Sequence, residues 1–123
     1  MQNDNAKFKN EFKKRLYDFT LKLIKFLDKL PKDNISKRIG DQLLRSGTSI
    51  IANFVEGQAA SSKKDFINFL NFSLKSANES KLWFALLRDS GRATAQEVDW
   101  YAREVNEVAN ILASSILTLK GKR

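Results

Sequence analysis

The residues best placed to do chemistry lie in and around the stretch SGTSIIANFVEG, residues 46–57. Counting 100° per residue puts several polar side chains on one side of a helix, at successive spacings of four, three, four, four and three residues. We call this set the polar ribbon, and it consists of Arg38, Gln42, Arg45, Ser49, Asn53 and Glu56. Such a row could form part of a catalytic or metal site, or it could hold helices together through hydrogen bonds.

The chemistry open to this chain is narrow. It contains no Cys and no His, which removes thiolate nucleophiles, the commonest general base and the commonest metal ligand. Glu56, Asp65 and Glu79 do not form an i, i+4 carboxylate pair, and no glycine-rich phosphate loop or GxSxG motif is present. We therefore predict no enzyme, no catalytic residue, no metal and no cofactor. A carboxylate-metal enzyme is the least supported alternative.

Four amphipathic helices must position these residues. Apolar side chains recur at steps of three and four over residues 6–30, 34–56, 62–90 and 95–119. The connections between these segments are short, which favours antiparallel neighbours. The sequence therefore predicts a single all-α domain, residues 1–123, folded as an antiparallel up-down-up-down four-helix bundle.

Helix boundaries have recognisable signals. Pro31 stops the first helix, and Gly57 sits where a helix-ending glycine belongs. The third and fourth helices open with Ser62-Lys-Lys-Asp65 and Thr94-Ala-Gln-Glu97, the first resembling a capping box and the second matching one.

The surroundings of the polar ribbon leave two interpretations open. It is either the solvated back of a helix or a surface covered by a neighbour. No Lys occurs between residues 39 and 62, although Lys is abundant elsewhere, which favours a covered ribbon. In that case Arg45, Asn53 and Glu56 need hydrogen-bond partners. Glu79 is in a similar position, because its helical neighbours include the aromatic residues Phe72 and Trp83, which are unusual company for a hydrated carboxylate.

Positive charge is concentrated in the first third of the chain. The net charge is +8, and residues 1–45 contain 12 basic and 6 acidic side chains. Helical counting gathers four of the lysines, Lys14, Lys22, Lys25 and Lys29, into a mainly basic stripe that Glu11 and Asp18 dilute. With Arg38 and Arg45 these lysines could bind the phosphates of RNA or DNA. The alternative is an ordinary solvated helix face.

A second apolar strip lies beside the basic stripe. Tyr17, Leu21 and Ile24 project between the stripe and the core face of the first helix, and Trp100 projects beside the main apolar stripe of the fourth. Apolar strips beyond the core often mark contacts between subunits. We predict an oligomer contact here, with a broad core face as the alternative.

Residues 43–80, LLRSGTSIIANFVEGQAASSKKDFINFLNFSLKSANES, carry a family resemblance. They resemble the small four-helix-bundle proteins encoded in intervening sequences of bacterial 23S rRNA genes. The matching positions are Arg45, Ser49-Ile50, Asn53, Glu56-Gly57, Ser62, Asp65-Phe66, Phe69-Leu70 and Glu79. The chain departs from the pattern at Ile51, where a Pro is common, and at Gln58.

The resemblance implies a bundle that assembles into a ring, often a pentamer. It also implies kinship with the accessory proteins of diversity-generating retroelements, which bind nucleic acid and a reverse transcriptase. Residues of the family motif, including Arg45, Ser49, Asn53, Glu56, Gly57 and Glu79, are then expected to be structural.

Two functions remain in competition. The first is a non-enzymatic homo-oligomer that binds RNA or DNA through a basic surface, with a protein partner such as a reverse transcriptase. The second is a protein-interaction scaffold that binds no nucleic acid. No apolar run approaches the roughly 18 residues of a membrane span, and no signal peptide is apparent, so we expect a cytoplasmic protein in a bacterium.

Overall fold

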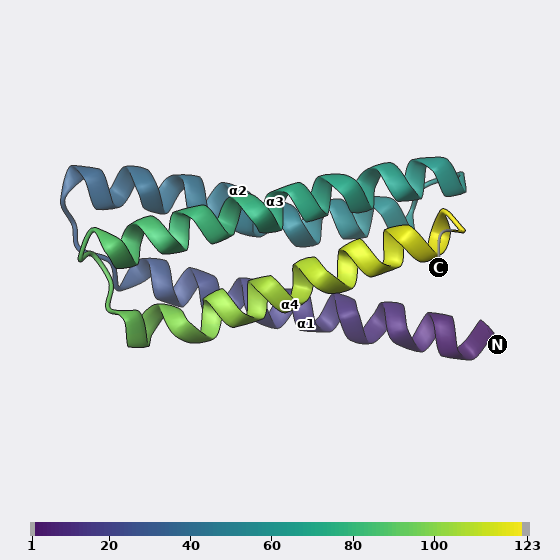
Figure 1. Ribbon diagram of the computed structural model, residues 1–123, viewed down its shortest axis with the longest axis horizontal. Helices are drawn as coiled ribbons and strands as arrows, with labels where there is room; N and C mark the ends of the chain where they lie inside the picture. Colours follow the sequence, from purple (N-terminus) through teal and green to yellow (C-terminus); the bar gives the residue numbers. More distant parts are fainter. Residues whose placement is uncertain (1, 122–123) are drawn as a thin grey trace.

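Four helices form the protein. The computed structural model describes the backbone of residues 2–121 and the side chains of residues 5–121. The helices are α1 (Gln2–Asp28), α2 (Asn34–Gln58), α3 (Lys63–Asp89) and α4 (Ala95–Leu119). Consecutive helices run in opposite directions, so the two ends of the chain lie at the same end of the bundle (Figure 1). The predicted all-α four-helix bundle is confirmed.

Local capping explains where three of the helices begin. The side chains of Asp33 and Ser62 accept hydrogen bonds from backbone N–H groups in the first turns of α2 and α3. At α4 the capping box is complete, because the Glu97 N–H donates to Thr94 Oγ1 at 3.0 Å and the Thr94 N–H donates to Glu97 Oε1 at 2.7 Å. These bonds satisfy backbone donors that the helix itself leaves without acceptors.

The end of α2 corrects the prediction for Gly57. The helix continues to Gln58, and Gly57 lies inside it, buried and with a negative φ. A Cβ at Gly57 would lie 3.0 Å from Phe69 Cβ and 3.1 Å from Phe66 Cδ1. Glycine is needed here because α3 packs closely against α2, and the helix does not end in a left-handed residue.

The other boundaries differ from the prediction by a few residues. α1 begins at Gln2 and ends at Asp28, two residues before its predicted end, and Lys29 and Leu30 form a turn before Pro31. α3 is one residue shorter than predicted at each end, whereas α4 spans the predicted residues.

The core lies along the axis of the bundle and receives residues from all four helices. Its largest fully buried side chains include Phe19, Leu23, Leu43, Ile50, Leu70, Phe84, Val105 and Leu112. Close approach of α1 to α2 depends on Gly47, where a Cβ would overlap the side chain of Leu23. Approach of α2 to α3 depends on small residues, among them the buried Ser46, Ser73 and Ser80.

The bundle opens at the end that holds the two termini. α1 and α4 diverge toward that end (Figure 1). Between them lies a cavity of about 350 Å³, lined in part by Phe8, Phe12, Leu112 and Leu119. Phe8 continues the apolar spacing of α1 but is 47% exposed at this open end of the bundle. No helix in the described part of the chain is both long and apolar enough to cross a membrane.

Candidate nucleic-acid interface

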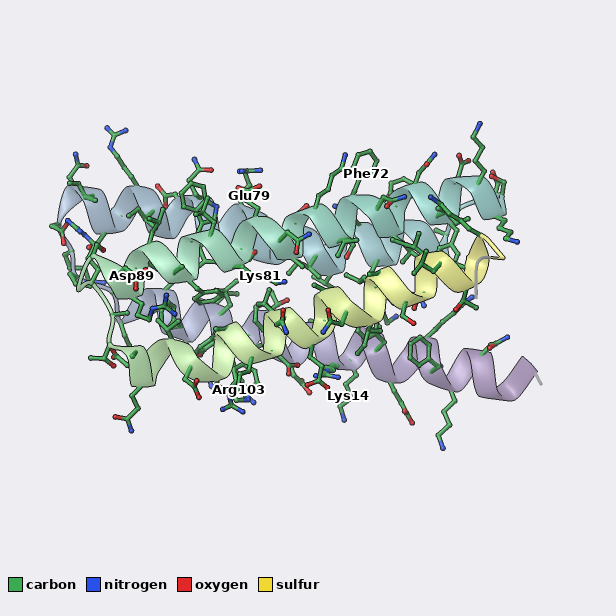
Figure 2. The ribbon with its side chains drawn as sticks, viewed as in Figure 1. Lys14, Phe72, Glu79, Lys81, Asp89 and Arg103 are labelled. Atoms are coloured by element: carbon green, nitrogen blue, oxygen red, sulfur yellow. The ribbon has the colours of Figure 1, made fainter. Side chains whose placement is uncertain are left out.

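The basic stripe of α1 is exposed along its length. Lys14, Lys22, Lys25 and Lys29 all lie at the surface. Within residues 5–121 every ion pair uses an arginine as its cation, so none of these lysines forms an ion pair with a carboxylate in that range. Lys14 points away from the bundle on the side opposite Glu79 and Phe72 (Figure 2). The stripe is therefore free to bind an external anion.

The side of the stripe next to α4 is bordered by aromatic rings. Lys22 Nζ lies 4.5 Å from the centroid of the Trp100 ring, a cation–π contact. The Tyr101 hydroxyl donates a hydrogen bond to the Lys22 carbonyl at 2.9 Å, which ties α4 to α1. Burial raises the pKa of the Tyr101 phenol, so the group remains a neutral donor.

Trp100 lies at the edge of the core. Its ring stacks against Phe19 with centroids 6.3 Å apart and meets Tyr101 edge-on at 5.0 Å. The side chain is half-buried against the core. The structure thus gives Trp100 a packing role within the chain, and its assignment to an oligomer contact stays a prediction.

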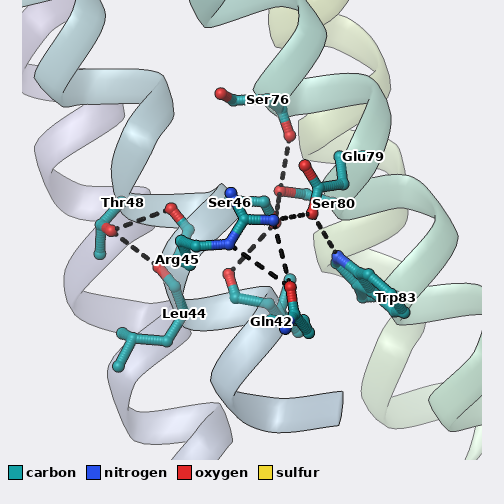
Figure 3. Close-up of polar contacts among 10 residues, drawn as sticks. Gln42, Leu44, Arg45, Ser46, Thr48, Ser76, Glu79, Ser80 and Trp83 are labelled. Carbon is teal, nitrogen blue, oxygen red and sulfur yellow. Dashed lines mark hydrogen bonds and ion pairs between the residues drawn. The ribbon is translucent and has the colours of Figure 1, made fainter. Parts of the chain in front are cut away.

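Arg45 is engaged within the chain, unlike the lysines. Its guanidinium donates to Gln42 Oε1 at 3.1 Å and pairs with Glu79 Oε2 at 2.5 Å (Figure 3). Trp83 Nε1 donates to the same Glu79 oxygen at 2.9 Å. This four-residue network, which we call the α2–α3 bridge, supports the expected structural role of Arg45 and Glu79. Arg38 is exposed and keeps its predicted availability for phosphate.

The remaining motif residues do not connect helices within one chain. Asn53 Nδ2 donates to the carbonyl and to the hydroxyl of Ser49, both at 2.9 Å and both in α2. Glu56 is exposed, and no side-chain hydrogen bond to it is found among the described residues. Among the described residues neither Asn53 nor Glu56 forms a hydrogen bond with another helix, so the expected link to a neighbouring helix is not found within the chain. A contact with another subunit stays a prediction.

Buried serines connect the same two helices from the inside. Ser46 Oγ lies 2.8 Å from Ser80 Oγ, and Ser73 Oγ donates to the Ile50 carbonyl at 2.7 Å. The small size of these residues indicated close packing, but nothing in a single helix indicates that the hydroxyls meet. With the α2–α3 bridge outside and the serines inside, α2 and α3 form the most tightly joined pair in the bundle.

One polar contact has no signal in the sequence. Arg15 Nε and Nη2 donate to the two carboxylate oxygens of Glu104 at 2.7 and 2.9 Å, and Nη2 also lies 3.0 Å from Glu107 Oε1. The hydrogen bond with Glu104 raises the pKa of Arg15, with Glu107 adding to the effect. This bidentate pair joins α1 to α4 and removes Arg15 from the cations available to a ligand.

The second apolar strip is not part of the core. Tyr17, Leu21 and Ile24 are 58%, 44% and 42% exposed. The broad-core alternative for this strip is therefore excluded within the chain. Leu44 and Val55 of α2, the helix that packs beside this side of α1, are also exposed. An apolar outer surface thus runs along two adjacent helices.

No group of three or more acidic side chains that could hold a metal ion occurs in the described part of the chain. The arrangement offers cations, exposed apolar side chains and a well-packed interior.

Comparison with known proteins identifies a family and a solved structure that resemble this chain. The model of the 23S rRNA-intervening sequence protein family matches residues 9–114. A crystal structure from Bacteroides thetaiotaomicron, described as a protein with unknown function from the S23 ribosomal protein family, is 33% identical in sequence. The alignment covers 88% of this chain and 96% of that chain, with a TM-score of 0.82. No curated protein matches the chain.

Proposed function

The chain belongs to the 23S rRNA-intervening sequence protein family, and on this basis we propose that it is a non-catalytic homo-oligomer that binds RNA or DNA through the basic stripe of α1. The observation that supports binding most directly is the state of the four lysines in the stripe. They are exposed, they share one helix face, and no carboxylate among the described residues forms an ion pair with them.

Binding through this stripe should follow the backbone of the nucleic acid. Lysines recognise phosphates as point charges, and each phosphate neutralised releases counterions into the solvent. Stacking on bases would need free aromatic rings. Phe12, Phe19, Phe26, Phe54 and Phe84 are buried in the core, and the exposed rings of Phe8, Tyr17 and Phe72 lie outside the basic stripe. We therefore expect affinity that depends strongly on salt and weakly on base sequence.

Oligomerisation would use the apolar outer surface of α1. An exposed run made of Tyr17, Leu21 and Ile24 is costly to leave in water, and burying it against another subunit would be favourable. A ring would also repeat the basic stripe around the assembly. Several stripes acting together would raise the avidity for a long polyanion well above that of one subunit.

Fluorescence anisotropy with labelled single-stranded RNA and DNA, measured across a salt series, tests the binding proposal. The test variant replaces Lys14, Lys22, Lys25 and Lys29 with Gln. A control variant with the same change in net charge replaces Lys63, Lys64, Lys75 and Lys81 of α3 with Gln. We expect the α1 variant to lose far more affinity, and to lose more of the salt dependence, than the α3 variant.

Two results would contradict the proposal. Equal losses in the two variants would show that net charge, and not the stripe, governs binding. A wild-type protein that binds no RNA or DNA at low salt would overturn nucleic-acid binding altogether. The exposed apolar surface would then favour a protein-interaction scaffold as the function.

A further inference from the structure

One end of the basic stripe lies at a cleft, and one of the cationic side chains lining this cleft comes from a distant part of the sequence. The cleft has a volume of about 260 Å³ and lies between the last turns of α1, the α3–α4 loop and the start of α4. Its lining includes four cationic side chains, which are Lys22 and Lys25 from α1, Lys29 from the turn after α1 and Arg92 from the loop. Arg92 did not stand out in the sequence, because it is 63 or more residues away from these lysines.

Arg92 has a buried donor without an acceptor. Its Nε is buried and makes no hydrogen bond within the described structure. The Asp33 carboxylate is the ion-pair partner of this nitrogen, but Oδ1 lies 3.7 Å away, beyond hydrogen-bonding distance. The carboxylate already accepts bonds from the N–H and hydroxyl of Ser36 at 3.0 and 2.7 Å. A buried N–H group without an acceptor is unfavourable, and the side chain that carries it lines the cleft.

The backbone around Arg92 is held firmly. Gly91 has a φ of 78°, a left-handed conformation that turns the chain at the end of α3. The N–H groups of Arg92 and Ala93 both donate to the Leu87 carbonyl, at 2.9 and 3.0 Å. Ala93 is buried. The backbone that carries the guanidinium is therefore fixed before any ligand binds, which lowers the entropy lost on binding.

The single carboxylate in the lining does not neutralise the four cations. Glu97 accepts a hydrogen bond from the Thr94 N–H at 2.7 Å as part of the capping box of α4. That bond lowers the pKa of Glu97, and the nearby Lys29 contributes less. Counting Asp33, the ion-pair partner of Arg92, together with Glu97, the four cations still outnumber the two carboxylates, so the cleft favours an anion rich in acceptor oxygens.

From this convergence we infer that the cleft binds a phosphate group of the nucleic-acid backbone, with Arg92 and the lysines at the end of α1 as its ligands. The inference rests on the proposed function and makes it more specific. Arg92 would hold one phosphate in a defined place, whereas Lys14 and the rest of the stripe would contact the polyanion along α1. This gives the stripe a fixed end at the junction of α1 with the α3–α4 loop.

Single substitutions test the cleft in the full-length protein. Arg92→Gln and Lys25→Gln each remove one positive charge from the lining, and Lys64→Gln removes one at the opposite end of α3 as the control. We expect each cleft variant to lose about 5-fold in RNA affinity near 0.1 M salt, because one phosphate contact on a single strand contributes about 0.7 to the slope of log K against log salt. The salt slope should fall by about this amount, and Lys64→Gln should change affinity by less than about 2-fold.

Further measurements separate the outcomes. Arg92→Lys keeps the charge but loses the planar guanidinium, so we expect a loss smaller than that of Arg92→Gln. Circular dichroism melting confirms that each variant is folded, and Lys25 is exposed, so its substitution tests the cleft independently of folding. If Arg92→Gln matches Lys64→Gln while the variant that lacks the four stripe lysines still loses RNA affinity, the cleft is overturned and the proposed function stands. If no nucleic acid binds to the wild-type protein, both fail.

Another experiment distinguishes binding of a nucleic-acid phosphate from binding of free inorganic phosphate. Isothermal titration with inorganic phosphate measures whether the cleft takes the free ion. Binding of inorganic phosphate that depends on Arg92, together with RNA binding that does not, would overturn the assignment to a nucleic-acid backbone. Competition between inorganic phosphate and RNA in the wild-type protein, reduced in Arg92→Gln, would support it.

Discussion

Arg45 of α2 and Glu79 of α3 form an ion pair across the outer surface of the bundle, with Arg45 Nη2 2.5 Å from Glu79 Oε2. The side chain of Glu79 is only 33% exposed, and Trp83 donates to the same oxygen. This relationship explains why a carboxylate can stand among Phe72, Trp83 and Leu86 on α3. Two donors from two different helices satisfy it.

The α2–α3 bridge should contribute modestly to stability. We expect Glu79→Ala to lower the free energy of unfolding by about 1 kcal/mol, because it removes a partly exposed ion pair and the acceptor of the Trp83 N–H. A double-mutant cycle with Arg45→Ala, followed by urea denaturation, measures the pair itself. A coupling energy of about 0.5 kcal/mol or more is expected. Strictly additive single effects would mean that the pair contributes nothing.

Gly57 and Gly40 should respond differently to the same substitution. Both lie inside α2, where Ala favours helix by about 1 kcal/mol over Gly. At Gly57 the new Cβ would meet Phe69 Cβ at 3.0 Å, next to the α3 backbone, whereas at Gly40 it would meet the mobile end of Leu30 at 3.2 Å. We expect Gly57→Ala to destabilise by about 1–3 kcal/mol and Gly40→Ala to be nearly neutral. Thermal melting compares the two, and equal melting temperatures would refute the packing role of Gly57.

Acid should weaken the start of α4. The hydrogen bond from the Thr94 backbone lowers the pKa of Glu97 in the folded protein. A carboxyl with a lowered folded pKa adds stability above its unfolded pKa, and that stability is lost as the pH falls through the folded pKa. We expect the difference in Tm between wild type and Glu97→Gln to be largest near neutral pH and to shrink in acid. Glu56→Gln, which removes a carboxylate with no hydrogen bond in the described chain, is the control. A difference for Glu97→Gln that is constant with pH would contradict the expectation.

The apolar strip of α1 should control assembly without controlling folding. Replacing Tyr17, Leu21 and Ile24 with Ser, Gln and Gln removes apolar side chains that are all more than 40% exposed. Light scattering after size exclusion should show a smaller particle, while the helical circular dichroism signal is kept. Leu82→Gln, which changes a 51% exposed leucine on α3, is the control and should leave the particle unchanged. Loss of helical signal in the α1 variant, or a monomeric wild-type protein, would rule out this contact.

Much of the fold could be predicted from the sequence, because the signals that form and end a helix lie close together in the chain. Apolar spacing, Pro31 and the Thr94–Glu97 capping box all act within a few residues, so they located four helices to within a few residues of their ends. The abundance of lysine on one face of α1 was equally visible. Gly57 was misread because a glycine near a helix end fits both a cap and a close contact. Only its packing against α3 distinguishes the two.

Tertiary structure alone decided which side chains meet. Arg45 and Glu79 are 34 residues apart, and Arg15 and Glu104 are 89 apart. Whether such pairs form depends on how far one helix slides and rotates against the next, and that register is set by packing of the whole core. The same reason explains Arg92, whose position beside the lysines of α1 follows from the turn at Gly91 and the path of the chain into α4. The sequence by itself determined the helices and their charge, whereas the packing of those helices decided which charges form ion pairs within the chain and which do not.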